Sequence, residues 1–257
     1  MSVRSHIEAV AKRSLLSEVE RAGIRRSLDT LEDRVEVYFE RLEEHFPFGS
    51  FTRGTLMPRT MDADSDVDYM VVFEDQGYKP STYLSWLRRF AEARYSNSIV
   101  GQSAPAIRLD LNHIRFELVP AIKTYRGLQI PAPSSDYEDW MLTYPYAFKS
   151  RLNEVNAGRF YLVKPMLRVL KYWNSVASYP FPSYPLEELA TESNFYNCSN
   201  LKDVFYNAVL QLPVSYNDTA FRRNAVERAK AIVNKAREYE QDNCPALAEG
   251  EIRKLLP

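Results

Sequence analysis

The sequence has few of the residues that form disulfide frameworks or thiolate metal sites. Among its 257 residues there are two cysteines, Cys198 and Cys244, and three histidines. The cysteines are far apart and match no metal-binding or redox spacing, so we expect free thiols in a reducing compartment such as the cytoplasm. The histidines are scattered, which argues against a zinc site built from histidine and cysteine.

Long apolar runs and a strong charge imbalance are also missing. No stretch of about 18 or more uncharged apolar residues occurs, which predicts that no helix spans a membrane. The N-terminus, Met-Ser-Val-Arg-Ser-His-Ile-Glu, lacks the apolar core of a signal peptide. The formal net charge is −1, which gives no support to a large nucleic-acid surface and leaves a local basic groove open. The chain is long enough for a large core, as one domain or two packed halves.

Hydrophobic spacing predicts that the N-terminal half mixes helices and strands. From about residue 5 to 45, apolar residues recur every three or four positions, which predicts helix, with Gly23 as a point of division. The apolar run Val67–Phe73 predicts a short buried strand. The segment 81–95 predicts a further helix, with Ser81 as its N-cap.

Two strand-like runs, 106–111 and 114–119, are separated by two residues that can form a turn. A two-residue turn places Asp110 opposite Arg115. Two residues further along each strand, it places Arg108 opposite Glu117. The charged side chains of the two strands then share one face, and the apolar side chains share the other. The prolines that follow predict a loop: Pro120, Pro131 and Pro133.

From about residue 140 onward the spacing predicts helices alone. They cover roughly 146–157, 162–177, 184–196, 200–211 and 218–241. The predicted fold class is therefore α+β, a mixed sheet with helices followed by an all-helical half. We expect the first domain, including the N-terminal helix, at residues 1–140 and the helical domain at 141–257.

Four aspartates alternate with other residues before and into the predicted strand: Asp62, Asp64, Asp66 and Asp68. Residues i and i+2 of a strand point to the same side, so the last two should project together. Their mutual repulsion is relieved by a divalent cation, and Mg²⁺ favours carboxylate oxygens together with phosphates. Two-metal phosphoryl transfer needs a third carboxylate from a neighbouring strand, for which Glu117 and Asp110 are candidates.

The same acids are also explained without a metal. Aspartate-rich loops are common. The hairpin acids could form cross-strand ion pairs, Asp110 with Arg115 and Glu117 with Arg108.

A Gly-Ser pair stands about fifteen residues before the acids. Gly49-Ser50 in a turn lets backbone N–H groups approach an anion, and the serine hydroxyl adds a donor. Followed by Ser65-Asp66-Val67-Asp68, the pair resembles the signature of polymerase-β-like nucleotidyltransferases. That likeness implies their core fold for the first domain.

A longer set of motifs resembles one family, the bacterial CD-NTases, which are cGAS/DncV-like nucleotidyltransferases of antiphage signalling. The matching segments are Phe48–Thr55, Asp64–Asp68 and Phe116–Ala121. The family has an aspartate where this chain has Glu117, a change that keeps the charge and adds one methylene. The helical domain is then expected to complete the nucleotide cleft.

The resemblance implies the site residues. Two Mg²⁺ ions, or Mn²⁺ in their place, are expected on the catalytic acids Asp66, Asp68 and Glu117, with Asp110 as the fallback third acid. The implied contacts to the nucleotide are Gly49, Ser50, Arg53, Lys171, Ser183 and Tyr184.

Three of these contacts come from the helical half. Leu170–Asn174 resembles the family's Lys-x-Trp helix, whose lysine contacts the phosphates, and Ser183–Glu187 resembles its Ser-Tyr-x-Leu-Glu segment. Simpler interpretations stay open. Lys171 could lie on a solvated basic face, Ser183 could be an N-cap and Tyr184 could pack in the core. Arg53 and its neighbour Thr55 could brace the Gly-Ser turn.

The resemblance implies an enzyme that joins nucleoside triphosphates into a cyclic di- or trinucleotide signal for a downstream effector protein. We expect a cytoplasmic monomer with no membrane or stable nucleic-acid partner. Two alternatives are a toxin-like transferase that adds nucleotides to tRNA or a protein, and an inactive relative that only binds nucleotides.

Overall fold

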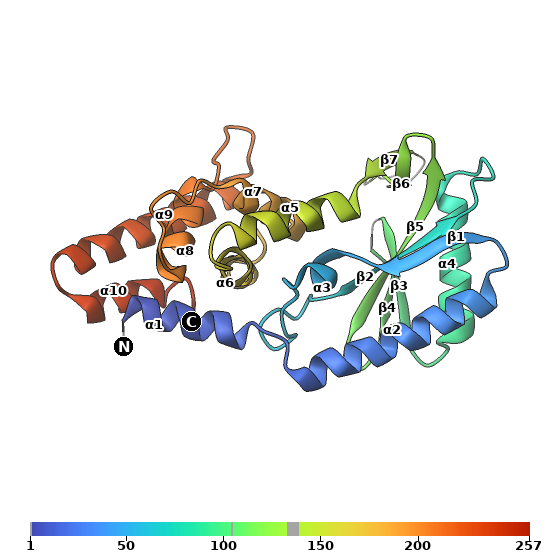
Figure 1. Cartoon of the computed structure of the whole chain (residues 1–257), viewed down its shortest axis with the longest axis horizontal. Coiled ribbons are helices and arrows are strands. Elements are labelled where there is room, and N and C mark those ends of the chain that lie inside the picture. Colours follow the sequence, from blue (N-terminus) through green and yellow to red (C-terminus); the bar gives the residue numbers. More distant parts are fainter. Residues whose placement is uncertain (1, 104, 133–138) are drawn as a thin grey trace. The chain divides into compact units, whose positions relative to one another are not determined.

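A computed structural model describes residues 2–103, 105–132 and 139–257 of the chain. The chain forms two compact units (Figure 1). The helical unit contains Met1–Leu15, Thr60–Ala63 and Ser150–Pro257, and the sheet unit contains Leu16–Arg59 and Asp64–Lys149. The N-terminal helix, expected within residues 1–140, thus belongs to the helical unit.

A mixed sheet forms the core of the sheet unit. Its strands are β1 (Leu42–Pro47), β2 (Val67–Phe73), β3 (Ile99–Ser103), β4 (Ala106–Asp110), β5 (Arg115–Thr124), β6 (Gly127–Pro131) and β7 (Trp140–Thr143). The strand order is β1-β2-β5-β4-β3, with β6 paired to β5 and β7 to β6. β2 and β5 run parallel, and the other neighbouring pairs are antiparallel. The α+β class is confirmed.

The predicted hairpin is confirmed residue by residue. β4 and β5 pair with Asp110 opposite Arg115 and Arg108 opposite Glu117. The alternate, apolar residues of the same strands face the core and are at most 1% exposed: Ile107, Leu109, Phe116 and Leu118. A two-residue period with one buried face fixes this register, because a shift by one residue would expose the apolar set.

The predicted proline loop is wrong, because β5 and β6 occupy it. Pro120 lies inside β5, between the residues paired with β4 and those paired with β6. Its missing N–H therefore costs no bond to β4 or β6, while on the other side of β5 it stands opposite Val71 of β2. Pro131 ends β6, and Pro133 lies outside the described residues.

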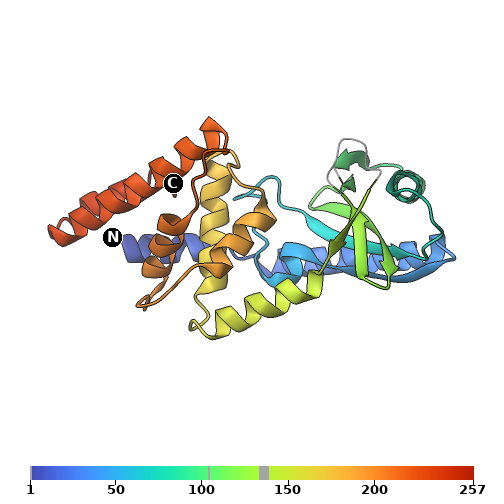
Figure 2. The ribbon, with the colours of Figure 1, turned by 90° about the horizontal axis from the view of Figure 1, so that it is seen from above.

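Two helices cover one face of the sheet, as Figures 1 and 2 show: α2 (Glu18–Tyr38) and α4 (Pro80–Arg94). The buried stripe of α2 has helical spacing: Ile24, Leu28, Leu31 and Val35. It packs with the odd-numbered residues of β2 in one hydrophobic cluster. α4 begins at Pro80, and its N-cap is Lys79 rather than the predicted Ser81.

The N-terminal helical segment divides at Ser17, not at Gly23. The Ser17 side chain accepts from the Glu20 N–H at 3.2 Å, and the Glu20 carboxylate accepts from the Ser17 N–H at 2.9 Å. This reciprocal capping box starts α2, and α1 (Val3–Arg13) ends before it. The helix predicted to about residue 45 is also too long, because α2 ends at Tyr38 and β1 begins at Leu42.

The helical unit is a set of packed helices around one core. Its members are α1, the end of α5 (Pro145–Ala157), α6 (Val163–Val176), α7 (Ser183–Glu192), α8 (Leu201–Gln211), α9 (Ala220–Gln241) and α10 (Pro245–Ile252). The two chain ends meet where His6 Nε2 lies 2.8 Å from the Leu256 carbonyl oxygen. Within the described ranges, no helix has both the length and the apolar character required to span a membrane.

Burial on α2 predicts where the sheet unit is most sensitive to truncation. Leu31 is fully buried, so Leu31→Ala should lower the free energy of unfolding by about 2–5 kcal/mol. Val37 on the same helix is 76% exposed, so Val37→Ala should change it by less than about 0.5 kcal/mol. Urea denaturation of both variants checks this, and equal losses would contradict the packing described.

Candidate active site

The acids from the two predicted strands lie next to each other in the sheet. β2 and β5 are parallel neighbours, and their register pairs Asp68 with Glu117. Directly paired residues of adjacent strands project to the same face, so these two carboxylates share one face. Asp66 lies two residues before Asp68, at the entry to β2, and all three are partly exposed.

That face is the one opposite α2 and α4. Val67 and Tyr69, the neighbours of Asp68 in the chain, belong to the cluster beneath the two helices. Met70 and Val72, which share the parity of Asp68, belong to a separate small cluster. The strand period therefore buries one set of side chains and presents the acids on the other side.

The backbone of Gly49 packs against the carboxylate of Asp68. A Cβ built on Gly49 would lie 1.7 Å from Asp68 Oδ2, so no larger residue fits while the carboxylate keeps its place. Gly49 also has φ +68°, a left-handed conformation that glycine adopts without strain. The Phe48 N–H donates to the Asp68 carbonyl at 3.0 Å, which attaches this segment to β2. The Gly-Ser pair and the acids thus form one local structure.

Gly49-Ser50 begins a short helix, α3 (Gly49–Arg53), rather than a simple turn. The Ser50 carbonyl accepts from the Thr55 N–H at 3.0 Å and from the Leu56 N–H at 3.1 Å, and Thr55 is fully buried. These bonds close the segment, so Thr55 braces it, as one interpretation held. Arg53 is 7% exposed, and its guanidinium carbon lies 5.3 Å from the centre of the Phe148 ring.

The two earlier aspartates of the alternating set are held by other side chains. Tyr179 donates its hydroxyl to Asp62 at 2.6 Å within the helical unit. Arg115 donates from Nη1 to Asp64 at 3.1 Å within the sheet unit. Both aspartates therefore anchor the segment before β2. Their two-residue spacing from Asp66 and Asp68 continues outside the strand, which begins at Val67.

Each carboxylate oxygen of Asp110 lies beside an arginine side chain. Its Oδ1 accepts from Arg115 Nε at 2.8 Å, and its Oδ2 lies 2.9 Å from Arg108 Nε. Partial burial works against ionisation, but these two guanidinium groups outweigh it and hold the pKa of Asp110 below its ordinary value. The predicted Asp110–Arg115 pair is therefore present.

Glu117 has a different environment from Asp110. Its side chain forms no hydrogen bond or ion pair with any residue that the structure describes, and Arg108 opposite it pairs with Asp110 instead. The predicted Arg108–Glu117 pair does not form. Since both oxygens of Asp110 face arginines, Glu117 fits the part of the third acid better.

The residues fit a hard divalent cation by their chemistry. Asp68 and Glu117 supply oxygen donors on one face of two adjacent strands, and Asp66 stands just before β2; carboxylate oxygen is the donor type that Mg²⁺ prefers. Across the described ranges, no three His, Cys, Asp or Glu side chains are already gathered at metal-binding distance.

Lys171 is not on a solvated face. Its Nζ donates to Glu187 Oε1 at 3.1 Å, and the two side chains are 7% and 0% exposed. Arg168, on the same stripe, is 6% exposed. Removing one partner of such a buried pair costs about 3–5 kcal/mol, because the other charge is left uncompensated. Sequence spacing did not identify Glu187 as the partner, because the two residues are 16 positions apart on different helices.

The other two contacts expected in the helical unit lie at the start of α7. Ser183 is the first residue of α7, but Pro182 is the N-cap and no side chain caps the helix, so the N-cap interpretation is wrong. Tyr184 is 47% exposed and donates to Glu188 at 3.3 Å, so it does not pack in the core. Contacts of Lys171, Ser183 and Tyr184 with a nucleotide stay predictions.

Comparison with protein families identifies the chain. The Second Messenger Oligonucleotide or Dinucleotide Synthetase (SMODS) domain matches residues 1–156, more than half of the sequence. The chain belongs to this family. It is a CD-NTase-type nucleotidyltransferase, and the resemblance drawn from the Gly-Ser and aspartate motifs is confirmed. A comparison with curated proteins finds no match.

Solved structures share the fold over most of the chain. The CD-NTase CdnG of Bradyrhizobium diazoefficiens in complex with GTP has a TM-score of 0.73 at 12% identity, over 99% of this chain and 98% of that one. DncV cyclic AMP-GMP synthase of Vibrio cholerae, a prokaryotic cGAS homolog, has 0.70 at 11%, over 88% and 87%. CdnC of E. coli MS115-1 with ATP has 0.65 at 15%, over 92% and 90%.

The packing of Gly49 predicts a specific loss in Gly49→Ala. The new Cβ displaces the Asp68 carboxylate, so nucleotidyl transfer should fall on the order of 100-fold, as expected for a reacting group moved by about 1 Å. Gly77→Ala is the matched control, because Gly77 has φ +71° but nothing within 4 Å of its Cβ. Pyrophosphate release measures the effect, and an equal loss in both variants would contradict it.

The environment of Asp110 predicts a pH-dependent stability. A lowered folded-state pKa stabilises the protein above the ordinary pKa of 3.8, and this contribution is lost as the pH falls towards the folded-state value. Asp110→Asn should therefore lower Tm near pH 7, and its difference from wild type should shrink below about pH 4. Thermal unfolding between pH 3 and pH 7 measures this. Exposed Asp29→Asn is the control, and a pH-independent difference for Asp110→Asn would contradict the assignment.

Proposed function

We propose that this nucleotidyltransferase joins nucleoside triphosphates into a cyclic di- or trinucleotide and releases pyrophosphate. The supporting observation is the pairing of Asp68 with Glu117 on adjacent parallel strands, with the backbone of Gly49 packed against Asp68. This arrangement brings the acids of β2 and β5 next to the backbone of the Gly-Ser segment, whose N–H groups could bind a phosphate. Solved relatives with GTP or ATP support triphosphates as substrates.

Two divalent cations, Mg²⁺ or Mn²⁺, would be held by Asp66, Asp68 and Glu117. When bound, they would neutralise charge on the transferring phosphate and on the attacking and leaving oxygens. The carboxylate face of β2 and β5 would supply the oxygen ligands, and the two arginines on Asp110 favour Glu117 over it as the third acid.

The protein's own groups would orient the substrates and accept the proton. A ribose hydroxyl oxygen of one nucleotide attacks the α-phosphorus of another. The new P–O bond forms as the bond to the bridging oxygen breaks, and pyrophosphate leaves. Glu117 accepts the hydroxyl proton, since its carboxylate has no partner among the described residues. The backbone N–H groups and hydroxyl of Gly49-Ser50 hold the donor phosphates.

Three further residues would contact the nucleotide, and a fourth would support the phosphate-binding segment. We propose that Lys171 and Ser183 bind the triphosphate and that Tyr184 stacks on a base, as the family resemblance implies. The exposure of Tyr184, 47%, leaves its ring available for stacking. Arg53, packed on Phe148, would support the phosphate-binding segment and add positive charge near it.

The product would act as a second messenger in antiphage defence, read by an effector protein. We place the reaction in the cytoplasm, where nucleoside triphosphates are available. Cyclisation follows when the same site joins the free hydroxyl of a linear intermediate to its own triphosphate, so one set of acids serves both steps.

The acids of β2 give the direct test. Asp66→Ala combined with Asp68→Ala should abolish product formation from labelled nucleoside triphosphates with Mg²⁺ or Mn²⁺, because two of three oxygen donors are removed. Phosphatase treatment followed by mass spectrometry identifies a resistant, cyclic product. Asp64→Asn is the matched control in the same segment and should retain most activity, since Asp64 is bound to Arg115 rather than facing the site.

Different results would select different functions. Unchanged product in the double variant would overturn the site assignment. Label found on tRNA or protein instead of a small product would favour the toxin-like transferase. Bound nucleotide without turnover in the wild type would show an inactive relative.

A further inference from the structure

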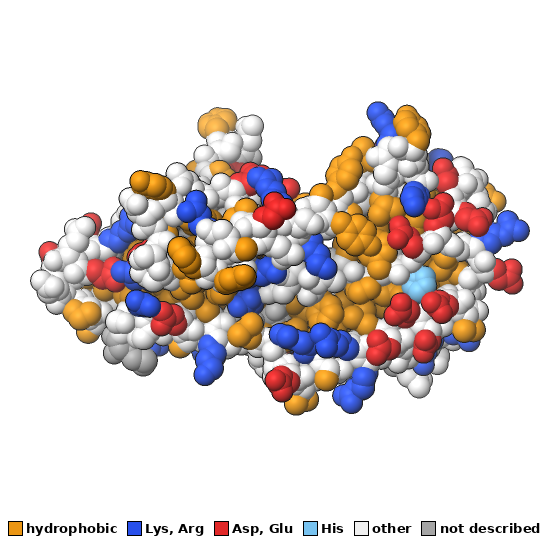
Figure 3. Space-filling model, in the orientation of Figure 1, with side chains coloured by type: hydrophobic (Ala, Val, Ile, Leu, Met, Phe, Trp, Pro, Cys, Tyr) orange, Lys and Arg blue, Asp and Glu red, His pale blue; other side chains and the backbone are white. Residues whose placement is uncertain are grey.

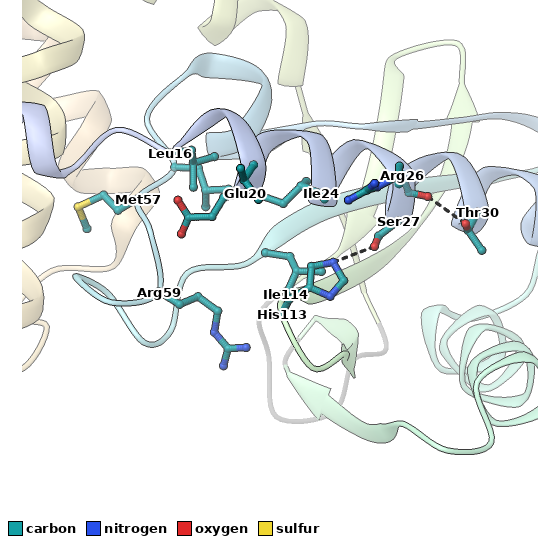
Figure 4. A pocket seen from close by; sticks show the side chains of 13 residues that line it. Leu16, Glu20, Ile24, Arg26, Ser27, Thr30, Met57, Arg59, His113 and Ile114 are labelled. Carbon is teal, nitrogen blue, oxygen red and sulfur yellow. Dashed lines mark hydrogen bonds between the residues drawn. The ribbon is translucent and has the colours of Figure 1, made fainter.

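The sheet unit also contains a cavity, which is separate from the candidate active site. It has a volume of about 470 Å³ and is bounded by the N-terminal half of α2, the segment after α3 and the turn between β4 and β5 (Figure 4). None of Gly49, Ser50, Asp66, Asp68 or Glu117 lines it. A volume in this range is typical of small-molecule sites.

The cavity has an apolar floor and a polar rim. Its apolar lining side chains are Leu16, Val19, Ile24, Leu56, Met57 and Ile114. Leu56 and Met57 are 4% and 1% exposed, so packing fixes their positions in this floor. At the rim, the Ser27 hydroxyl lies 3.0 Å from His113 Nε2, which connects α2 to the hairpin turn (Figure 4).

The rim carries excess positive charge. Arg26 and Arg59 line the cavity, and neither guanidinium forms an ion pair with any described residue. Glu20 carries the single carboxylate that lines the cavity. Its Oε2 accepts hydrogen bonds from the Ser17 N–H and hydroxyl in the cap of α2. Glu18 and Glu20 stand in the first turn of α2, and Arg21, Arg25 and Arg26 follow them. Figure 3 shows basic and acidic side chains mixed on the face that it draws.

We propose that this cavity is a second ligand site, which binds a small organic anion with an apolar ring body. The ring would lie on the floor formed by Leu56, Met57 and Ile114, and the anionic group would accept from Arg26 and Arg59. A neutral apolar ligand would make no use of the two guanidinium groups, and a purely polar anion would leave the floor uncovered.

The cavity walls continue into the active-site segments, so the ligand acts as an effector. The Leu56 N–H donates to the Ser50 carbonyl at 3.1 Å, so this wall is bonded to the Gly-Ser segment. Ile114 lies three residues before Glu117, on the other side of the cavity. A ligand that fixes both walls changes the position or mobility of Ser50 and Glu117. This coupling rests on the proposed function, whereas the binding does not.

The binding is tested with 2-naphthoate as the probe and its neutral analogue 2-naphthamide. Isothermal titration of the full chain should show one saturable site for 2-naphthoate and binding weaker by about ten-fold for the amide, since the amide lacks the charge. The double change Arg26→Gln with Arg59→Gln should weaken 2-naphthoate about ten-fold and leave the amide unaffected. No saturable binding to the wild type, or equal affinities for both probes, would overturn the proposal.

Two variants on α2 separate charge from space. Arg25→Gln is the matched control, because Arg25 is exposed on the same helix but does not line the cavity. It should bind as the wild type does. Gly23→Leu fills the cavity, since a Cβ on Gly23 already lies 3.7 Å from His113 Cδ2, and should abolish binding of both probes. Circular dichroism confirms folding, and retained binding in a folded Gly23→Leu variant would place the site elsewhere.

The coupling is measured separately. Saturating 2-naphthoate should change the rate of pyrophosphate release by the wild type and not by the double arginine variant, whose basal rate is unaltered. An unchanged rate with proven binding would overturn the effector role. A wild type without pyrophosphate release would instead refute the proposed function, and the titration would still decide the ligand site.

Discussion

The close approach of the Gly49 backbone to the Asp68 carboxylate is the constraint on which the active site depends. It joins Gly49, which lies many residues before β2, to Asp68 within β2. The contact requires both a positive φ at Gly49 and the absence of a Cβ. The carbonyl of Asp68 is bonded to Phe48 at the same place, so β2 is fixed on one side by this segment and on the other by β5. Glu117 then lies beside Asp68 because the parallel register leaves it no other position.

Charge pairing distinguishes Asp110 from Glu117, the two candidates for the third acid. Asp62, Asp64 and Asp110 each accept a hydrogen bond from tyrosine or arginine, and such bonds favour the ionised form and fix the side chain. Glu117 has no such partner within the described residues, although it stands opposite an arginine. Arg108 reaches Asp110 on its own strand, two residues away on the same face, which leaves the third acid exposed on the sheet.

The two faces of the sheet serve different ends. One presents the acids, and the other is covered by α2 and α4 and contains the cavity near the start of α2. The turn before β5 and the segment after α3 line the cavity, and the same two stretches of chain lead directly into β5 with Glu117 and into β2 with Asp68. A ligand in the cavity and a nucleotide at the acids would therefore act on the same backbone from opposite sides.

The sequence alone determined the features that depend on local period and short motifs. Alternation predicted the β4–β5 register, and three- and four-residue spacing predicted the buried stripe of α2. The Gly-Ser and Asp-x-Asp motifs indicated the family and the paired acids. Only the tertiary structure decided the rest. β1 and β6 have no clear alternation and exist because neighbouring strands supply hydrogen bonds, and Ser17 rather than Gly23 divides the first helices because its capping box forms. Which acids are paired, and that Lys171 is buried against Glu187, depends on residues far apart in the chain, which spacing does not bring together.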